Sequence, residues 1–343
     1  MSKFLVTGES DIPRFRLAPL MLVFDITDPH NPSIIKEVEI AKPALSFAIH
    51  ENLLFCNEIG ALQVFDFSFC KDIRPVSTIE KSGGGSSTIV DESGLLLYLS
   101  NWDRGILAVD VSNSESPLIV GSCGCDYFSR EDEASARAGI KPYGVVQMEK
   151  RGNYIFANAA EYNPKKQREA LFVYDVSDPA NPGKFGKLSV APIRGHGMIV
   201  NGDNAFVAGV EKILTIDISD PRDPCIIGEL CLPGLYITYC FHDNDLMYIS
   251  GALLYKQRRT AFASVIDISN PIHPELMGEI SLPMEAGFKT YAKEKMLYVA
   301  CYGGLAIVDV SEPAKPVLIS THPATRSGTE LSGIETFDLW PGS

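Results

Sequence analysis

The chain has 343 residues, of which 45% are hydrophobic and 21% are charged, and its formal net charge is -13. This apolar content is sufficient for a core and argues against a disordered chain. The acidic balance argues against nucleic acid as the main partner, because phosphate binding needs a basic surface. No apolar run approaches the roughly 18 residues of a membrane span or the ~7–15 residues of a secretory leader. We therefore expect a cytoplasmic protein with no membrane partner, in which the eight cysteines are mostly reduced.

One short phrase recurs along the chain: an apolar run, an aspartate, an aliphatic residue or Phe, and then Ser or Thr. Its seven aspartates, in chain order, are Asp25, Asp66, Asp110, Asp175, Asp217, Asp267 and Asp309. Most of their spacings are close to the ~42 residues of a four-stranded blade. Each aspartate is expected to accept hydrogen bonds from backbone N–H groups of the turn that follows it. The phrase therefore predicts one strand and one turn in each of seven repeats.

The best-formed copy is LAIVDVSEPAKPVLIS at 305–320, in which prolines stop one strand and begin the next. Six copies keep such a proline, whereas FSFCKDIRP after Asp66 is degenerate. The pattern resembles the LVIVD-repeat family of β-propellers over nearly the whole chain. The resemblance implies an all-β fold, with seven four-stranded antiparallel blades in a single domain spanning 1–343. It implies little about activity.

The two ends of the chain are predicted to share one blade. Residues 3–8 fit the second strand of the first blade, with no inner strand before them. Residues 333–339 fit an inner strand with no blade after it. We expect this last strand to complete the first blade, which closes the ring and removes an open sheet edge.

Long connections are predicted at four places: 9–19, 123–141, 159–169 and 252–261. In an up-and-down blade all four lie on the same face of the disc, which is where function usually sits on a rigid scaffold. The second insertion is predicted to hold a short helix at about 129–138, between an N-terminal cap and a glycine stop. Basic residues outnumber acidic ones in the four insertions together. This face is therefore expected to favour an anionic ligand.

The candidate catalytic residues are those placed at the channel mouth on the loop-bearing face. Of the six histidines only His196 begins an inner strand there, and imidazole is the usual acid or base near neutral pH. Arg194 and Tyr143 are its predicted partners. The predicted ligand-binding residues are Trp102, Arg104, Lys141, Glu161, Tyr236, Arg258 and Tyr302. Neither a metal nor a cofactor is predicted, because one histidine cannot supply a three-histidine site and no phosphate-binding glycine motif is present.

Two functions remain open from the sequence. One is a cofactor-free lyase, isomerase or hydrolase that uses His196 as acid and base on a small acid. The other is a non-catalytic module that binds a ligand or serves as a protein-interaction scaffold. The fold does not decide between them, because function depends on the site. The sequence does not predict the oligomeric state.

Overall fold

The computed structural model describes residues 3–10, 17–68, 72–82, 84–101, 104–124, 144–160, 169–190, 197–254, 259–325 and 330–338. Every regular element within these ranges is a β-strand, which confirms the all-β prediction. The strand pairs are antiparallel. The predicted helix at about 129–138 lies outside the described residues.

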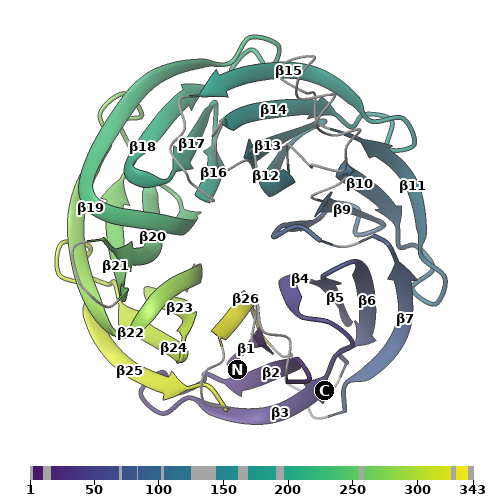
Figure 1. Ribbon diagram of the computed structural model, residues 1–343, viewed down its shortest axis with the longest axis horizontal. Coiled ribbons are helices and arrows are strands. Elements are labelled where there is room, and N and C mark those ends of the chain that lie inside the picture. The colour runs from purple at the N-terminus through teal and green to yellow at the C-terminus, as the bar shows by residue number, and fades with distance from the viewer. Residues whose placement is uncertain are drawn as a thin grey trace.

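The described strands pair into seven four-stranded units that follow one another around a common centre (Figure 1). The strands of each unit are given from the inner to the outer one. Unit 1 consists of β26 (Glu330–Asp338), β1 (Lys3–Ser10), β2 (Leu20–Asp25) and β3 (Ser33–Glu39), and unit 2 of β4 (Ala44–His50), β5 (Leu53–Glu58), β6 (Ala61–Asp66) and β7 (Arg74–Glu80). Unit 3 consists of β8 (Thr88–Val90), β9 (Leu96–Asn101), β10 (Gly105–Asp110) and β11 (Leu118–Cys123), and unit 4 of β12 (Gly144–Arg151), β13 (Tyr154–Ala160), β14 (Glu169–Asp175) and β15 (Gly183–Val190).

Two long strands link the later units, because the outer strand of one unit runs without a break into the inner strand of the next. Unit 5 consists of β16 (Gly197–Asn201), β17 (Asn204–Ala208), β18 (Val210–Asp217) and the first part of β19 (Cys225–Asp243). Unit 6 consists of the rest of β19, β20 (Leu246–Leu253), β21 (Thr260–Asp267) and the first part of β22 (Glu275–Lys293). Unit 7 consists of the rest of β22, β23 (Met296–Tyr302), β24 (Gly304–Asp309) and β25 (Val317–Pro323). The sequence predicted separate strands at both places.

The repeated aspartates have the predicted structural role in all seven units. In each, the backbone N–H two residues further on donates to Oδ1 over 2.7–2.9 Å. In six of the seven units the residue two positions after the aspartate is a serine. Hydrogen bonds from its side chain and its backbone lower the pKa of these six aspartates: Asp66, Asp110, Asp175, Asp217, Asp267 and Asp309. The ionised carboxylate therefore holds the turn that leads to the outer strand.

The core is divided among seven apolar clusters, each formed by the facing sides of two neighbouring units. One of them joins units 7 and 1, with Leu5 and Phe24 packed against Tyr298 and Ile307. Such packing of neighbour on neighbour is the general way in which repeat proteins bury apolar surface. It makes a rigid wall around the centre of the molecule.

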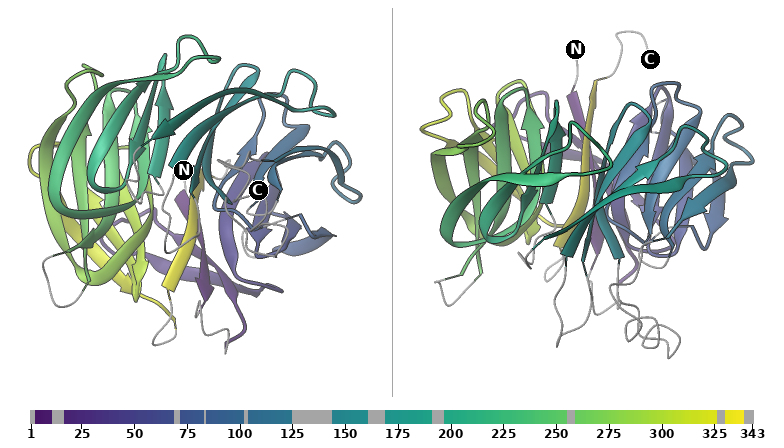
Figure 2. Two further views of the ribbon diagram at one scale, coloured as in Figure 1. Left: turned by 45° about the horizontal axis from the view of Figure 1, so that its top comes forward. Right: turned by 90° about the horizontal axis from the view of Figure 1, so that it is seen from above.

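Unit 1 combines the two ends of the chain. β26 pairs antiparallel with β1, with Phe4 opposite Phe337 and Leu5 opposite Thr336. Figure 2 shows the two strands side by side along the axis of the ring. β26 starts at Glu330, three residues before the predicted start, and β1 continues to Ser10 into the predicted first insertion.

Candidate functional site

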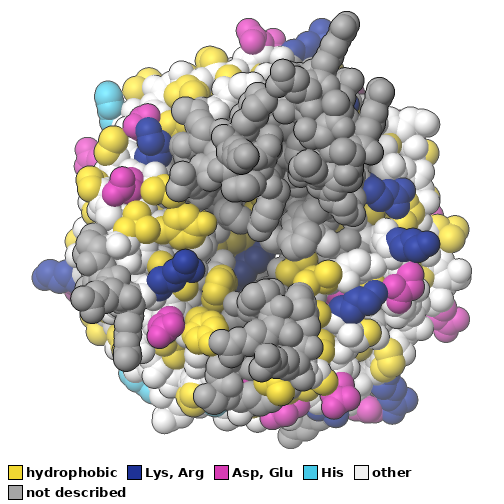
Figure 3. Space-filling view, viewed as in Figure 1, with side chains coloured by type: hydrophobic (Ala, Val, Ile, Leu, Met, Phe, Trp, Pro, Cys, Tyr) yellow, Lys and Arg dark blue, Asp and Glu magenta, His cyan; other side chains and the backbone are white. Residues whose placement is uncertain are grey.

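A cavity of about 260 Å³ lies at the common centre of the units. Its lining comes from the inner strands β4, β8, β12, β19 and β22, with two further residues, Ser86 and Ser87, just before β8. Figure 3 shows a hollow at the centre of one face, with basic and hydrophobic side chains around it. A cavity of this size has room for a small metabolite.

The side chains that face the cavity occupy equivalent positions in the repeat. Counted back from the last paired residue of each inner strand, Ser46, Tyr239 and Lys289 share one position. Glu149, Phe241 and Tyr291 share another, two residues further on. Alternate residues of a strand point to the same side, so the two positions form two layers around the channel.

A shift in the pairing of the inner strands determines where the side chains of the first layer point. The pairing of the inner strands is interrupted immediately before Ser46, Tyr239 and Lys289. An extra residue at such a bulge bends the strand and re-aims the side chain beside it. The repetition of this irregularity in several units indicates that it belongs to the architecture of the channel wall.

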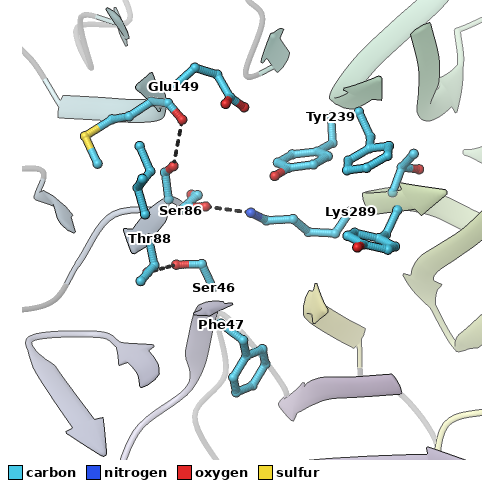
Figure 4. Close-up of a pocket in the computed structure, with 13 residues that line it drawn as sticks. Ser46, Phe47, Ser86, Thr88, Glu149, Tyr239 and Lys289 are labelled. Carbon is cyan, nitrogen blue, oxygen red and sulfur yellow. Dashed lines mark hydrogen bonds between the residues drawn. The ribbon is translucent and has the colours of Figure 1, made fainter. Parts of the chain in front are cut away.

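Lys289 crosses the channel (Figure 4). Its side chain leaves β22, and Nζ donates a 2.5 Å hydrogen bond to the Ser86 carbonyl oxygen before β8. The ammonium lies 4.1 Å from the ring centroid of Tyr239, within the range of a cation–π contact. Only 7% of Lys289 is exposed to solvent. Lysine is rarely this deeply buried, so its presence in a central cavity makes Lys289 a candidate functional residue.

The loop that receives Lys289 is held by buried side chains of other strands. Asn57 of β5 donates to the Gly85 carbonyl oxygen over 2.9 Å and accepts from the Gly84 N–H over 3.4 Å. A Cβ added at Gly85 would lie 2.1 Å from Ser100 Oγ, so only glycine fits there. The Ser86 carbonyl is therefore a fixed acceptor that faces the channel.

Glu149 of β12 lines the same cavity. Burial raises the pKa of its carboxyl to about 7, and the positive charge of Lys289 only partly offsets this effect. A carboxyl with such a pKa exists in both charge states near neutral pH, which is the property needed for proton transfer. The channel thus brings the amino group of Lys289 and a carboxyl of raised pKa into one cavity.

Hydroxyl groups and aromatic rings complete the lining. Ser46 Oγ and Thr88 Oγ1 are hydrogen-bonded to each other over 2.7 Å, and Ser87 Oγ donates to the Met148 carbonyl oxygen over 3.2 Å. Phe47, Phe241 and Tyr291 supply apolar surface. A few polar groups among aromatic side chains are typical of small-molecule sites.

Most of the site residues predicted from the sequence fall in segments that the structure does not describe. His196, Arg194, Tyr143, Trp102, Lys141, Glu161 and Arg258 all lie outside the described residues. Arg104, Tyr236 and Tyr302 are described, and none of the three lines the cavity. Arg104 is exposed, and its backbone N–H donates to Asn101 Oδ1. Tyr236 pairs with Val210 and Ala252, and Tyr302 with Glu285 and Glu330.

Sequence reasoning missed Lys289 and Glu149, although a signal for them exists. Aligned by their last paired residue, the described inner strands carry mostly apolar or hydroxyl side chains at the two channel-facing positions. Lys289 and Glu149 are the charged residues at those positions within the described strands. The bulges obscure this alternation, because they add one residue in the middle of the strand.

The described residues show no group of three or more His, Cys, Asp or Glu side chains placed to hold a metal ion. Within the same ranges no helix is long and apolar enough to cross a membrane. The chemistry visible in the channel is therefore that of an ammonium, a carboxyl, hydroxyls and aromatic rings.

The fold and the cavity define an all-β repeat protein whose four-stranded antiparallel units surround a central channel. The LVIVD repeat model matches residues 84–124, 196–230, 264–281 and 291–322. Over these residues the chain therefore carries repeats of the LVIVD type. Among curated proteins, none matches the sequence.

Solved structures with a similar fold cover nearly the whole chain. A candidate 6-phosphogluconolactonase from Bacteroides fragilis has a TM-score of 0.74 at 11% identity, over 98% of this chain and 98% of that one. Its counterpart from Bacteroides uniformis has a TM-score of 0.72 at 11% identity, over 98% and 99%. The Pan2 WD40 domain of Neurospora crassa has a TM-score of 0.58 at 13% identity, over 83% and 81%. At these identities the similarity shows a propeller-like fold and nothing about function.

Proposed function

We propose that the chain is a closed seven-bladed propeller whose central channel binds a small organic acid through Lys289. The observation that carries the proposal is the buried ammonium of Lys289, which spans the channel and ends on a backbone carbonyl. A neutral carbonyl is a weak partner for a buried cation, since charge-assisted hydrogen bonds to anions are shorter and stronger. An acid that enters the channel offers Lys289 a better acceptor than Ser86.

Three contacts support a closed ring. β26 pairs with β1, so the last strand takes the inner place in unit 1. The apolar cluster between units 7 and 1 is built like those between the other units. Ser320 in the outer strand of unit 7 donates to the Pro29 carbonyl oxygen of unit 1 over 2.6 Å. A closed ring keeps the five lining strands at fixed distances, which preorganises the site.

The lining favours a hydroxylated acid. Ser46 and Thr88 can exchange hydrogen bonds with ligand hydroxyls, and the aromatic rings provide surface for a carbon skeleton. The volume of about 260 Å³ suits a metabolite of small size. The two Bacteroides neighbours are candidate 6-phosphogluconolactonases, so sugar acids and sugar phosphates belong among the ligands to be tested.

The proposal includes catalysis as its second step. His196 is the proposed acid and base at the mouth of the channel, with Arg194 and Tyr143 as its partners, and no cofactor is required. If this holds, His196→Ala should lower turnover by about 10²–10⁴-fold while binding at Lys289 persists. Mass spectrometry of a recovered ligand that always returns unchanged from the wild type would contradict catalysis and leave binding intact.

The deciding experiment measures binding of matched ligand pairs by isothermal titration calorimetry. D-gluconate is paired with sorbitol, and glucose 6-phosphate with glucose, so each pair differs in the acidic group. We expect at least one acid to bind and its neutral match to bind more weakly. Lys289→Met should weaken binding of that acid by about 10–100-fold, since hydrogen bonds to charged groups contribute about 1.5–3 kcal/mol.

The control is Lys315→Met, which removes the same charge from an exposed turn of unit 7. It should leave every affinity unchanged. If neither acid binds, or if both lysine variants lose affinity equally, the channel is not the anion site.

A protein-interaction scaffold is the second candidate. It is favoured by large apolar side chains that stand exposed on outer strands, with Leu118 61%, Val317 55% and Ile226 47% accessible. Exposed apolar surface often marks an interaction site. This alternative predicts concentration-dependent association in analytical ultracentrifugation that Leu118→Lys or Val317→Lys abolishes and Lys289→Met does not affect.

A further inference from the structure

Glu149 lies opposite Lys289 across the cavity and has an unusual environment. Its strand β12 brings the side chain to the same layer as Phe241 and Tyr291, and Figure 4 shows it above the loop that receives Lys289. Among the described residues no hydrogen bond reaches its carboxyl oxygens. The nearby hydroxyl of Thr290, which is 1% exposed and lines the same cavity, also lacks a hydrogen-bond partner within the described residues. Buried polar groups normally have partners, so the Thr290 hydroxyl is available to a ligand, and the partly buried carboxyl of Glu149 faces the same cavity.

The pKa of the Glu149 carboxyl lies near neutral pH. Burial raises its pKa to about 7, with Lys289 as the opposing influence. Cys240 of β19 also feels both charges, but burial raises the pKa of its thiol well above the usual value, so it stays neutral. Tyr98 of β9 packs in one cluster with Met148, and burial raises its pKa to about 12. The described parts of β8, β13 and β16 place no charged side chain in the cavity. Glu149 is therefore a described group of the cavity with a pKa of about 7.

An anion bound to Lys289 would change the equilibrium between the ionised and the protonated form of Glu149. While Glu149 is ionised, the anion brings a second negative charge into the same cavity. Like charges disfavour the ionised form of a carboxyl. Once protonated, Glu149 no longer repels the anion and gains an O–H group that can donate to it. Binding and protonation therefore favour each other.

We propose that the channel captures its acid together with one proton, which is taken from solvent and added to the carboxylate of Glu149. This inference rests on the proposed function and adds a rule of specificity to it. The bound state contains the Lys289 ammonium, a ligand anion and a neutral Glu149, so one positive charge faces one negative charge. The ligand must then carry a single anionic group at Lys289 and an acceptor atom facing Glu149.

The test uses D-gluconate, whose carboxyl is ionised throughout pH 6–9. Its Kd for the wild type should rise by about tenfold between pH 6 and pH 8, and by about tenfold again by pH 9. Calorimetry in two buffers with different ionisation enthalpies should show uptake of about 0.9 proton at pH 8 and about 0.1 at pH 6, for a group with a pKa of about 7. The isosteric Glu149→Gln should bind with a Kd that does not change over this range, close to the wild-type value at pH 6.

His196 gives the matched control, because a protonated imidazole would also weaken anion binding as pH rises. His196→Ala should keep the full pH dependence if Glu149 is the titrating group. A pH dependence that survives in Glu149→Gln and disappears in His196→Ala would overturn the inference. So would a Kd and a proton uptake that stay constant from pH 6 to pH 9 in the wild type. Failure of the wild type to bind D-gluconate at any of these pH values would contradict the proposed function for sugar acids and this inference together.

Discussion

Ser320 Oγ donates a 2.6 Å hydrogen bond to the Pro29 carbonyl oxygen and thereby joins the outer strand of unit 7 to the turn between β2 and β3 of unit 1. The same contact occurs inside the ring, where Ser77 Oγ of unit 2 donates to the Ser114 carbonyl oxygen of unit 3, also over 2.6 Å. The two serines and the two carbonyls occupy equivalent positions of the repeat. The junction between the ends of the chain is thus built from a contact that the repeat already uses.

This equivalence predicts equal energetic effects at the two junctions. Ser320→Ala and Ser77→Ala should each lower the free energy of unfolding by about 1 kcal/mol, because each removes one hydrogen bond. Urea denaturation of both variants provides the comparison. A cost for Ser77→Ala together with no cost for Ser320→Ala would mean that the junction between units 7 and 1 is open in solution. Deletion of residues 331–343 should have a much larger effect, since it removes most of β26 and exposes the edge of β1.

Glycine takes the place of these serines in several other units. At Gly186 an added Cβ would lie 2.1 Å from the Pro221 carbonyl oxygen of the next unit, whereas at Gly183 on the same strand it would meet no atom within 4 Å. Gly186→Ala should therefore cost about 1–3 kcal/mol through forced separation of the two units. Gly183→Ala is the control and should change stability by about 0.5 kcal/mol or less. Thermal or urea unfolding of the two variants decides whether the units pack as closely as the structure shows.

Glu149 should make stability depend on pH even without a ligand. Its folded pKa of about 7 lies above the ordinary value of 4.5, so the folded state binds more protons between these values and loses stability as pH rises through them. Glu149→Gln should therefore be more stable than the wild type at pH 8 by about 2–3 kcal/mol and equally stable at pH 4. Glu92→Gln is the control of opposite sign, because the bond from Lys150 lowers the pKa of Glu92. A wild type and a Glu149→Gln variant with parallel stability profiles would show that Glu149 is well solvated.

The thiols offer a test that does not depend on any ligand. Cys56, Cys240 and Cys301 are free and buried, and burial raises the pKa of each, while Cys225 and Cys231 are free and exposed. An aromatic disulfide reagent should react quickly with the exposed pair in the native protein and with the buried three only after unfolding. Unfolding should release eight thiols in all if the protein works in a reducing compartment, as its sequence predicts. Fewer than eight would count against that compartment.

The repeat could be predicted from the sequence because the residues that define it lie close together in the chain. Asp217 and Ser219 fix one turn through hydrogen bonds between near neighbours in the chain, and an aspartate with Ser or Thr two residues later recurs in every unit. The pairing of β1 with β26 could also be predicted, because an incomplete first repeat requires a strand from elsewhere. These features depend on spacing along the chain, which a sequence displays directly.

The channel was not readable in the same way, because its contacts join residues far apart in the chain. Lys289 and Ser86 are separated by more than two hundred residues, and only the circular arrangement of the units brings them together. Bulges before Lys289 and Tyr239 also break the alternation that would have marked these residues as facing inward. Sequence reasoning favoured the long loops and the histidine beside them, and those residues stay a prediction.

The most direct test of the account is a crystal structure of the protein soaked with the acid that binds most tightly. The account predicts density for its anionic group within hydrogen-bond distance of Lys289 Nζ, with the bond from Lys289 to the Ser86 carbonyl broken or lengthened. Density for the acid on the outer strands or on a face away from the channel, with Lys289 still bound to Ser86, would contradict it.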